Sequence, residues 1–190
     1  TPLATLAKLG GGLVAAAVVL GLAQPYRRAR LLSFLHPFSH SSGSGYQVVQ
    51  SLFGLGRGHL IGVGLGASRA KWGFLPNAHT DFIFSILGEE MGLVGGLLVI
   101  LLFAGLAVLG VRIALRARDP MGSLLAVGTT AWVVSQAAIN IGAVTGILPV
   151  TGVPLPLVSY GGSSLVILMA ALGMLVNVAS SSHRGARPPA

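Results

Sequence analysis

The longest apolar stretch of the chain reads FIFSILGEEMGLVGGLLVILLFAGLAVLGV and covers residues 82–111. Only Glu89 and Glu90 interrupt it. As a helix rising about 1.5 Å per residue, it would be about 45 Å long, whereas the hydrocarbon core of a bilayer is about 30 Å thick. The stretch therefore predicts a membrane-spanning helix whose first turns project beyond the apolar zone.

Three further apolar runs cover residues 9–23, 121–148 and 164–179. The first run starts beside Lys8 and reaches the length of a span, about 20 residues, only if residues 3–7 extend it. A signal peptide does not fit this run, because no charged region precedes it and the chain does not begin with Met. The expected fold is an all-α, polytopic membrane helix bundle with about four transmembrane helices, and residues 1–190 are interpreted as the C-terminal part of a single multi-span domain.

The composition supports this fold class. Of the 190 residues, 53% are hydrophobic and only 8% are charged, against about 25% charged in ordinary soluble domains. So few charges cannot cover a soluble surface, and so much apolar bulk excludes intrinsic disorder. The absence of cysteine excludes disulfides, thiolate chemistry and cysteine-ligated zinc.

The net charge of +8 favours an anionic lipid or a phosphorylated substrate, and no nucleic-acid partner is expected. The positive-inside rule gives six cations on each side, and its greater weight for short loops places residues 180–190 in the cytoplasm as a tail. Residues 24–81 then form a long extracytoplasmic loop, whose six cations a bound anion would explain: Arg27, Arg28, Arg30, Arg57, Arg69 and Lys71.

Two segments of this loop have a recognisable pattern. Residues 46–53 predict a short amphipathic helix that lies on the membrane or in a groove. Residues 54–66 read GLGRGHLIGVGLG, without the strand and helix that a dinucleotide-binding fingerprint needs. Two interpretations remain open for them: a flexible, closely packed loop, or a phosphate cradle of bare backbone N–H groups to which Arg57, Arg69 and Lys71 add positive charge.

Asp81 is the only carboxylate in residues 24–81. Nearby cations favour its ionised form, which a base or a metal ligand needs. Thr80 or Asp81 is also placed to cap the helix that follows. In a helix, Asp81, Ser85 and Glu89 share one face, so Glu89 is expected to line the same cavity; interfacial placement of Glu89 is the alternative.

Polar residues also mark the C-terminal half. Gln136 and Asn140 are expected to join helices by hydrogen bonds. Residues 149–164 contain three prolines followed by SYGGSS, which predicts a re-entrant loop that lines a water-filled cavity.

Several ordered motifs together resemble the SEDS family of bacterial membrane proteins. They read YRRAR at 26–30, GYQVVQS at 45–51, GVGLG at 62–66, LPNAHTDFIF at 75–84, GEE at 88–90 and LPLVSYGGS at 155–163. The resemblance implies a multi-pass protein of the bacterial inner membrane, at the division septum, that polymerises lipid II into glycan strands. It also implies partners, namely a class B penicillin-binding transpeptidase and membrane proteins of the divisome.

The resemblance places the family's catalytic aspartate at Asp81, whereas many members carry glutamate where this chain has Asn77. The expected function is therefore a peptidoglycan glycosyltransferase, with a lipid II flippase as the alternative. The sequence identifies no certain cofactor, and Asp81 is a candidate ligand for Mg²⁺ or Mn²⁺. The candidate substrate-binding residues are Arg57, Arg69, Lys71, His79, Thr80, Glu89, Ser159, Gly161, Gly162 and Ser163.

Overall fold

The computed structural model describes residues 8, 11–12, 34, 38, 45–69, 75–76 and 79–184. The chain divides into two compact units, Thr1–Val49 and Gln50–Ala190, and most of the described residues belong to the second. The expected first span at residues 9–23 lies almost wholly outside the described residues. The candidate site residue Lys71, the variable position Asn77 and the cations Arg27, Arg28 and Arg30 also lie outside them.

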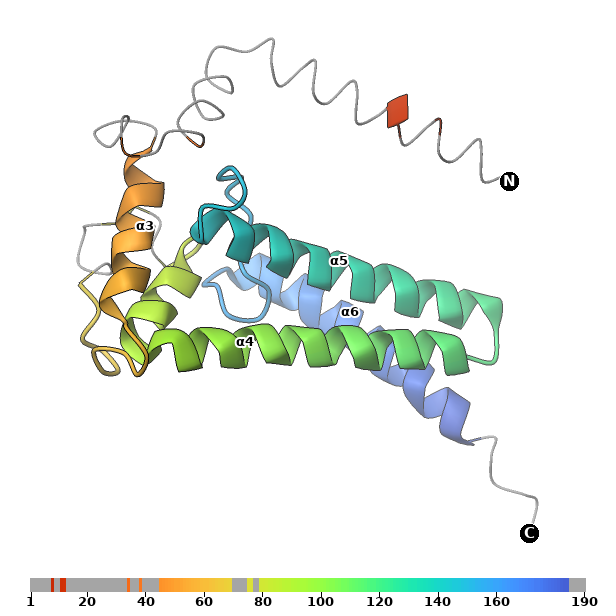
Figure 1. Cartoon of the computed structure of the whole chain (residues 1–190). Coiled ribbons are helices and arrows are strands. Elements are labelled where there is room, and N and C mark those ends of the chain that lie inside the picture. The colour runs from red at the N-terminus through yellow and green to blue at the C-terminus, as the bar shows by residue number, and fades with distance from the viewer. Residues whose placement is uncertain are drawn as a thin grey trace. The chain divides into compact units, whose positions relative to one another are not determined.

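The described residues form helices and no strand, as the all-α prediction requires. Four helices follow one another along the chain: α3 (Tyr46–Arg57), α4 (Ile83–Arg116), α5 (Pro120–Val144) and α6 (Gly162–Arg184) (Figure 1). Three of them, α4, α5 and α6, are long and apolar enough to cross a membrane. The fold class is confirmed for this part of the chain, as is the short helix expected at residues 46–53.

The ends of the helices differ from the sequence-based expectation for local reasons. Asp119 caps α5, since its side chain accepts a hydrogen bond of 2.6 Å from the Gly122 N–H, and Pro120 occupies the first turn. This helix ends at Val144 rather than at residue 148, because the left-handed Gly146 (φ 73°) turns the chain away. The last helix begins at Gly162 and continues to Arg184, so the first residues of the expected tail are helical.

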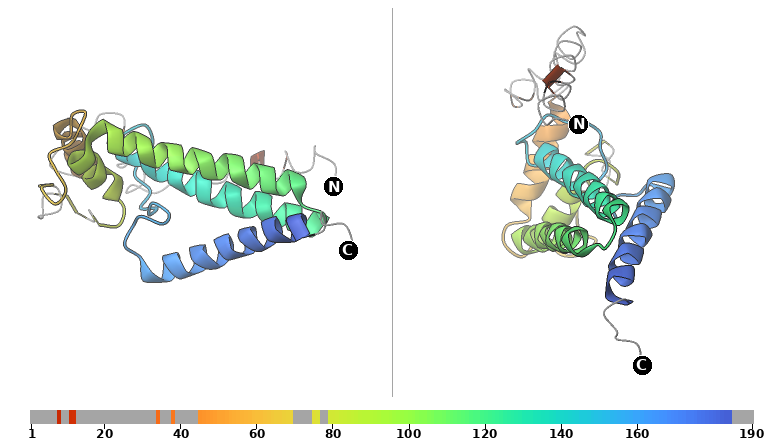
Figure 2. Two further views of the ribbon diagram at one scale, coloured as in Figure 1. Left: turned by 90° about the horizontal axis from the view of Figure 1, so that it is seen from below. Right: turned by 90° about the vertical axis from the view of Figure 1, so that its right-hand side faces the viewer.

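The three long helices pack against one another. α4 and α5 run side by side along their length, and α6 lies against both at its own angle (Figures 1 and 2). A Cβ at Gly110 of α4 would overlap the side chain of Thr130 of α5, so the missing side chain permits a close approach. The buried core between these helices includes Phe103, Val133 and Leu168.

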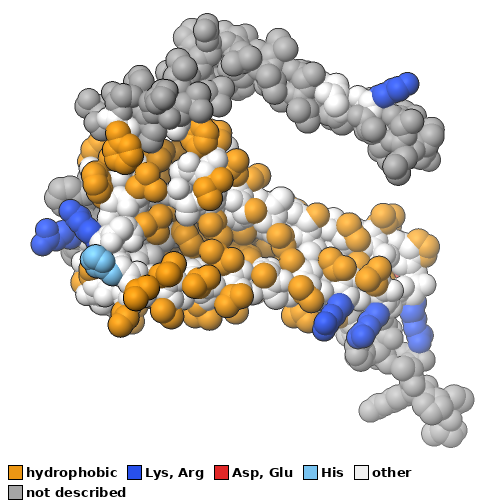
Figure 3. Space-filling view, viewed as in Figure 1, with side chains coloured by type: hydrophobic (Ala, Val, Ile, Leu, Met, Phe, Trp, Pro, Cys, Tyr) orange, Lys and Arg blue, Asp and Glu red, His pale blue; other side chains and the backbone are white. Residues whose placement is uncertain are grey.

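The outer surface of the bundle is apolar along its length. Large side chains such as Leu97, Leu101 and Leu102 on α4 are exposed, which suits contact with lipid tails rather than water. Figure 3 shows this apolar surface between two groups of basic side chains at the ends of the bundle. The distribution is that of an integral membrane protein.

Candidate functional site

α4 is broken near its N-terminal end, at Gly92. This residue has φ 67° and ψ −162°, a backbone conformation that is essentially restricted to glycine. A short arm (residues 83–91) and a long arm (residues 93–116) therefore point in different directions, as the bend near the start of α4 in Figure 1 shows. The expected helix is present, but the non-helical dihedral angles of Gly92 divide it into two arms.

The glycine-rich loop that follows α3, residues 58–66, fills this break with four backbone hydrogen bonds. An unbroken α-helix would bond the N–H groups of Leu93 and Val94 to the carbonyls of Glu89 and Glu90. Those N–H groups donate instead to the carbonyls of His59 (2.9 Å) and Leu60 (3.2 Å). In return, the N–H groups of Val63 (3.0 Å) and Gly64 (3.1 Å) donate to the carbonyls of Glu89 and Glu90. The loop thus caps the end of the short arm and the start of the long arm together.

Close contact with the α4 backbone explains two glycines of this loop. A Cβ at Gly58 would overlap the backbone of Gly88, and a Cβ at Gly62 would overlap the backbone at Glu90. Of the two open interpretations, close packing is therefore confirmed. The phosphate-cradle interpretation is wrong for the amides of Val63 and Gly64, since both N–H groups are already bonded to α4.

Glu89 is buried beside this loop, with 1% of its surface exposed. The Ser68 hydroxyl donates a hydrogen bond of 2.6 Å to its Oε2, and Nη1 of Arg57 lies 4.0 Å from its Oε1. A buried carboxylate needs such partners. The Glu89 side chain is therefore buried within the protein and faces neither water nor lipid. Nothing in the sequence marked Ser68 as its partner.

Asp81 lies in a turn before α4 and is half-buried. The residue that caps α4 is Phe82, and no side chain accepts a hydrogen bond there. The expectation that Thr80 or Asp81 caps the helix is therefore wrong, and so is the shared helical face of Asp81 and Glu89. Ser85 and Glu89 do share a buried face, and the Ser85 hydroxyl donates to the carbonyl of Ser51 in α3 (2.9 Å).

Hydrogen bonds to three consecutive backbone carbonyls hold the turn at residues 79–81. The Tyr160 N–H donates to the carbonyl of His79 (3.0 Å), and the Ser159 hydroxyl donates to the carbonyl of Thr80 (2.6 Å). Nδ2 of Asn140 donates to the carbonyl of Asp81 (2.8 Å). These three donors are far from the turn in sequence. They fix the backbone that carries the Asp81 carboxylate.

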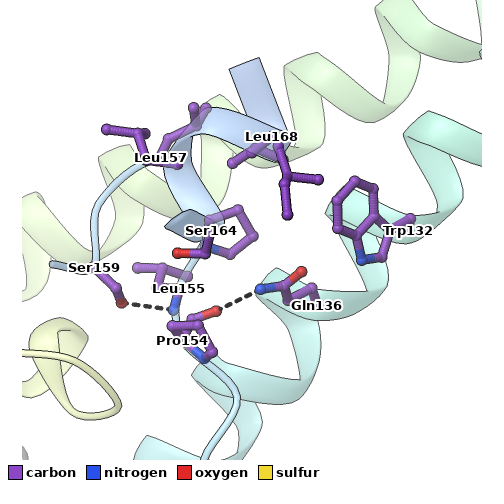
Figure 4. Close-up of a pocket in the computed structure, with 11 residues that line it drawn as sticks. Trp132, Gln136, Pro154, Leu155, Leu157, Ser159, Ser164 and Leu168 are labelled. Carbon is purple, nitrogen blue, oxygen red and sulfur yellow. Dashed lines mark hydrogen bonds between the residues drawn. The ribbon is translucent and has the colours of Figure 1, made fainter. Parts of the chain in front are cut away.

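The donors themselves belong to a connected network around the segment between α5 and α6, residues 145–161. Nδ2 of Asn140 also donates to the Val153 carbonyl (2.7 Å), and Nε2 of Gln136 donates to the Pro154 carbonyl (3.0 Å). The Ser159 hydroxyl accepts from the Leu155 N–H at 2.7 Å (Figure 4). Gln136 and Asn140 thus join α5 to this segment by hydrogen bonds to backbone carbonyls, and not to another helix as expected.

Gly152 of the same segment lies against the Asp81 carboxylate. A Cβ at this position would be 3.6 Å from Oδ2 of Asp81, and the residue has a left-handed backbone (φ 73°). The position of this glycine was not predicted, because a glycine among prolines is only a weak signal in the sequence.

Two hollows lie beside this network. The larger is an open cleft of about 540 Å³ that brings together four candidate site residues, His79, Ser159, Gly161 and Gly162. The smaller has a volume of about 140 Å³, and Figure 4 shows Trp132, Gln136, Pro154 and Ser164 around it. Such a concave site with a few convergent polar groups is typical of ligand binding.

The remaining candidates are more scattered. Ser163 is exposed on the first turn of α6, Arg69 is exposed beyond the glycine-rich loop, and the contact found for Arg57 is with Glu89. Within the described part of the chain, no three His, Asp or Glu side chains gather as a metal site would need.

Comparison with known proteins gives a consistent family. The profile of the cell cycle protein family FtsW/RodA/SpoVE matches residues 2–184. Stage V sporulation protein E of Bacillus subtilis (strain 168) is 51% identical over 166 residues, which are 87% of this chain and 45% of that protein. The probable peptidoglycan glycosyltransferase FtsW of Geobacter metallireducens is 47% identical over 155 residues, which are 82% of this chain and 41% of that protein.

A solved structure agrees with this result. It belongs to a study of the structural coordination of polymerization and crosslinking by a peptidoglycan synthase complex, and it matches with a TM-score of 0.70 and 30% identity. The match covers 93% of this chain and 50% of that one. The chain thus spans about half the length of the proteins it matches. By its sequence and by its fold, the chain belongs to the FtsW/RodA/SpoVE family of cell cycle proteins.

Proposed function

We propose that the full-length protein is a peptidoglycan glycosyltransferase that polymerises lipid II into glycan strands. The observation that carries the proposal is the turn at residues 79–81, which carries Asp81 and is fixed by three hydrogen bonds. His79 of this turn lines an open cleft of about 540 Å³. The relatives described as probable peptidoglycan glycosyltransferases, 47% identical in one case, support the same reaction.

In the proposed reaction, Asp81 is the general base. The 4-hydroxyl of the acceptor sugar attacks the anomeric carbon of the donor sugar, and its proton passes to the Asp81 carboxylate. A bond forms between the acceptor oxygen and the donor carbon, while the bond from that carbon to the lipid diphosphate breaks. The electron pair of the broken bond leaves with the diphosphate. Base catalysis of this kind typically contributes about 10²–10⁴-fold to a rate.

The leaving diphosphate is a stable anion, so it needs neutralising charge more than it needs a proton. Arg57, Arg69 and Lys71 are the proposed sources of that charge, followed by Arg27, Arg28 and Arg30. His79, Thr80, Ser159, Gly161, Gly162 and Ser163 are the proposed contacts to the sugars, since four of them line the cleft. Glu89 is proposed to support this site indirectly, because its carboxylate accepts a hydrogen bond from Ser68, just after the glycine-rich loop.

A divalent metal has no step in this mechanism. Mg²⁺ prefers six oxygen ligands, and among the described residues no three His, Asp or Glu side chains gather around Asp81. Diphosphate oxygens of the substrate would have to supply most of the ligands. If Mg²⁺ or Mn²⁺ binds here, Asp81 would hold it together with those diphosphate oxygens.

The proposed setting is the bacterial plasma membrane at the division septum. The proposed partners are a class B penicillin-binding transpeptidase and divisome membrane proteins. The matched structure supports a transpeptidase partner, since its description joins polymerization and crosslinking in one synthase complex.

Reconstitution tests the reaction class. The full-length protein, with its transpeptidase partner, is placed in vesicles that carry fluorescent lipid II in one leaflet. A glycosyltransferase makes glycan polymer without moving lipid II to the other leaflet. Transbilayer movement without polymer would refute the proposal and support a flippase instead.

A further inference from the structure

The glycine-rich loop exposes four large apolar side chains within six residues. The exposed fractions are 65% for Leu60, 84% for Ile61, 46% for Val63 and 81% for Leu65. Such a cluster outside the transmembrane helices is unusual on a surface that faces only water, and it indicates an apolar partner.

The depth of this loop along α4 is fixed by its hydrogen bonds. The carbonyls of His59 and Leu60 accept from Leu93 and Val94, the first residues of the long arm. From there the arm is apolar as far as Val111, and it then reaches Arg112 and Arg116. About 19 residues at 1.5 Å each give about 28 Å, close to the hydrocarbon thickness of about 30 Å. The loop is therefore level with the membrane–water boundary at the Asp81 end of the bundle.

The chemistry around the loop suits that boundary. Leu93 and Val94 are themselves exposed, so the apolar surface of the loop continues onto the lipid-facing surface of α4. Arg57 precedes the loop and Arg69 follows it, and both are exposed. Cations on either side of an apolar cluster match the arrangement of lipid phosphates above acyl chains.

We propose that residues 60–65 insert into the membrane–water boundary and anchor the glycine-rich loop in lipid. The occupant of this surface is the bilayer itself. The four hydrogen bonds to the broken α4 hold the loop at the required depth, and Leu60, Ile61, Val63 and Leu65 contact the upper parts of the acyl chains. The proposal concerns membrane contact alone and holds whichever reaction the protein catalyses.

Depth-dependent fluorescence quenching tests this contact. The chain contains no cysteine, so Ile61→Cys and Leu65→Cys, introduced into full-length protein freed of any other cysteine, accept one environment-sensitive dye each. The labelled proteins are placed in nanodiscs of phosphatidylethanolamine and phosphatidylglycerol. The nanodiscs contain lipids with a nitroxide near the headgroup or near the end of the acyl chain. Leu101→Cys, in the middle of the long arm, is the deep control, and the exposed Thr151→Cys is the aqueous control.

The proposal expects both loop dyes to be quenched more strongly by the shallow nitroxide than by the deep one. Leu101→Cys should show the opposite order, and Thr151→Cys should respond mainly to aqueous iodide. Strong iodide quenching of both loop dyes, without lipid quenching, would overturn the proposal in favour of a water-facing loop. Protection from both quenchers would overturn it in favour of burial against protein.

Discussion

At the scale of single residues, Asn140 has the most informative environment. It is buried on α5, and its Nδ2 donates to the carbonyls of Asp81 (2.8 Å) and Val153 (2.7 Å). Because one amide group donates both to the turn at residues 79–81 and to the segment at residues 145–161, it sets the distance between them. This makes Asn140 a positioning residue for Asp81 under the proposed function, with no contact to substrate required.

Replacement of Asn140 by leucine tests this role. Asn140→Leu keeps a side chain of similar size but removes the donor from two carbonyls. Each unsatisfied carbonyl lowers the free energy of unfolding by about 1–3 kcal/mol. Displacement of the base by about 1 Å lowers a rate by up to about 10²-fold. We therefore expect kcat for lipid II polymerisation to fall about 10- to 100-fold with KM little changed.

The matched control is Asn177→Leu, since Asn177 is exposed on α6. Both variants are compared in steady-state polymerisation and in thermal unfolding. Wild-type kcat for Asn140→Leu would refute the positioning role. A rise in KM alone would instead indicate that Asn140 binds substrate.

At the scale of elements, the central feature is the exchange of hydrogen bonds between α4 and the glycine-rich loop. Two helical bonds are given up at Gly92, and four bonds to the loop replace them. Ser68 and Arg57, which flank this loop, contact the buried Glu89 carboxylate. Apolar periodicity cannot predict such an exchange, because both helical arms have the composition of one continuous span.

Gly92→Ala tests whether the break is required. A Cβ there would lie 2.5 Å from the Gly62 nitrogen and 2.6 Å from the Leu60 carbonyl carbon, and the dihedral angles are strained for alanine. Strain of this kind costs about 1–3 kcal/mol. We expect a lower thermal unfolding midpoint and faster hydrogen exchange at the amides of Val63 and Gly64.

Gly105→Ala is the matched control on the same helix, because a Cβ at Gly105 meets no atom within 4 Å. Alanine is the better helix former by about 1 kcal/mol, so this variant should be neutral or slightly stabilised. Equal unfolding midpoints for the two variants would show that α4 tolerates a continuous helix.

At the scale of the whole molecule, the site forms where distant parts of the chain meet. Residues 79–81 precede α4, residues 145–161 connect α5 to α6, and both lie at the same end of the three long helices. The opposite end of α4 carries Arg112 and Arg116, and Arg118 comes just after it. This up-and-down arrangement follows from the order of apolar runs, and it is why the sequence predicts which loops share a side.

The sequence therefore predicted the long helices, the connection between α5 and α6, and the meeting of His79 with Ser159, Gly161 and Gly162. Hydropathy and motif order contain that information. The break at Gly92, the cap at Phe82 and the Ser68–Glu89 hydrogen bond were not predicted. They depend on contacts between segments that no local pattern records, and one glycine in a glycine-rich helix does not reveal its backbone angles.

The central claim is that Asp81 is the base of a glycosyltransferase, and one measurement addresses it directly. The rate of lipid II polymerisation is compared for three full-length proteins, the wild type, Asp81→Asn and the control Asp119→Asn. The transpeptidase partner is present in each case. Asparagine caps helices as well as aspartate does, so Asp119→Asn should retain near wild-type activity. Asp81→Asn should be about 10²- to 10⁴-fold slower while remaining folded and membrane-inserted. Polymerisation at the wild-type rate by Asp81→Asn would contradict the account.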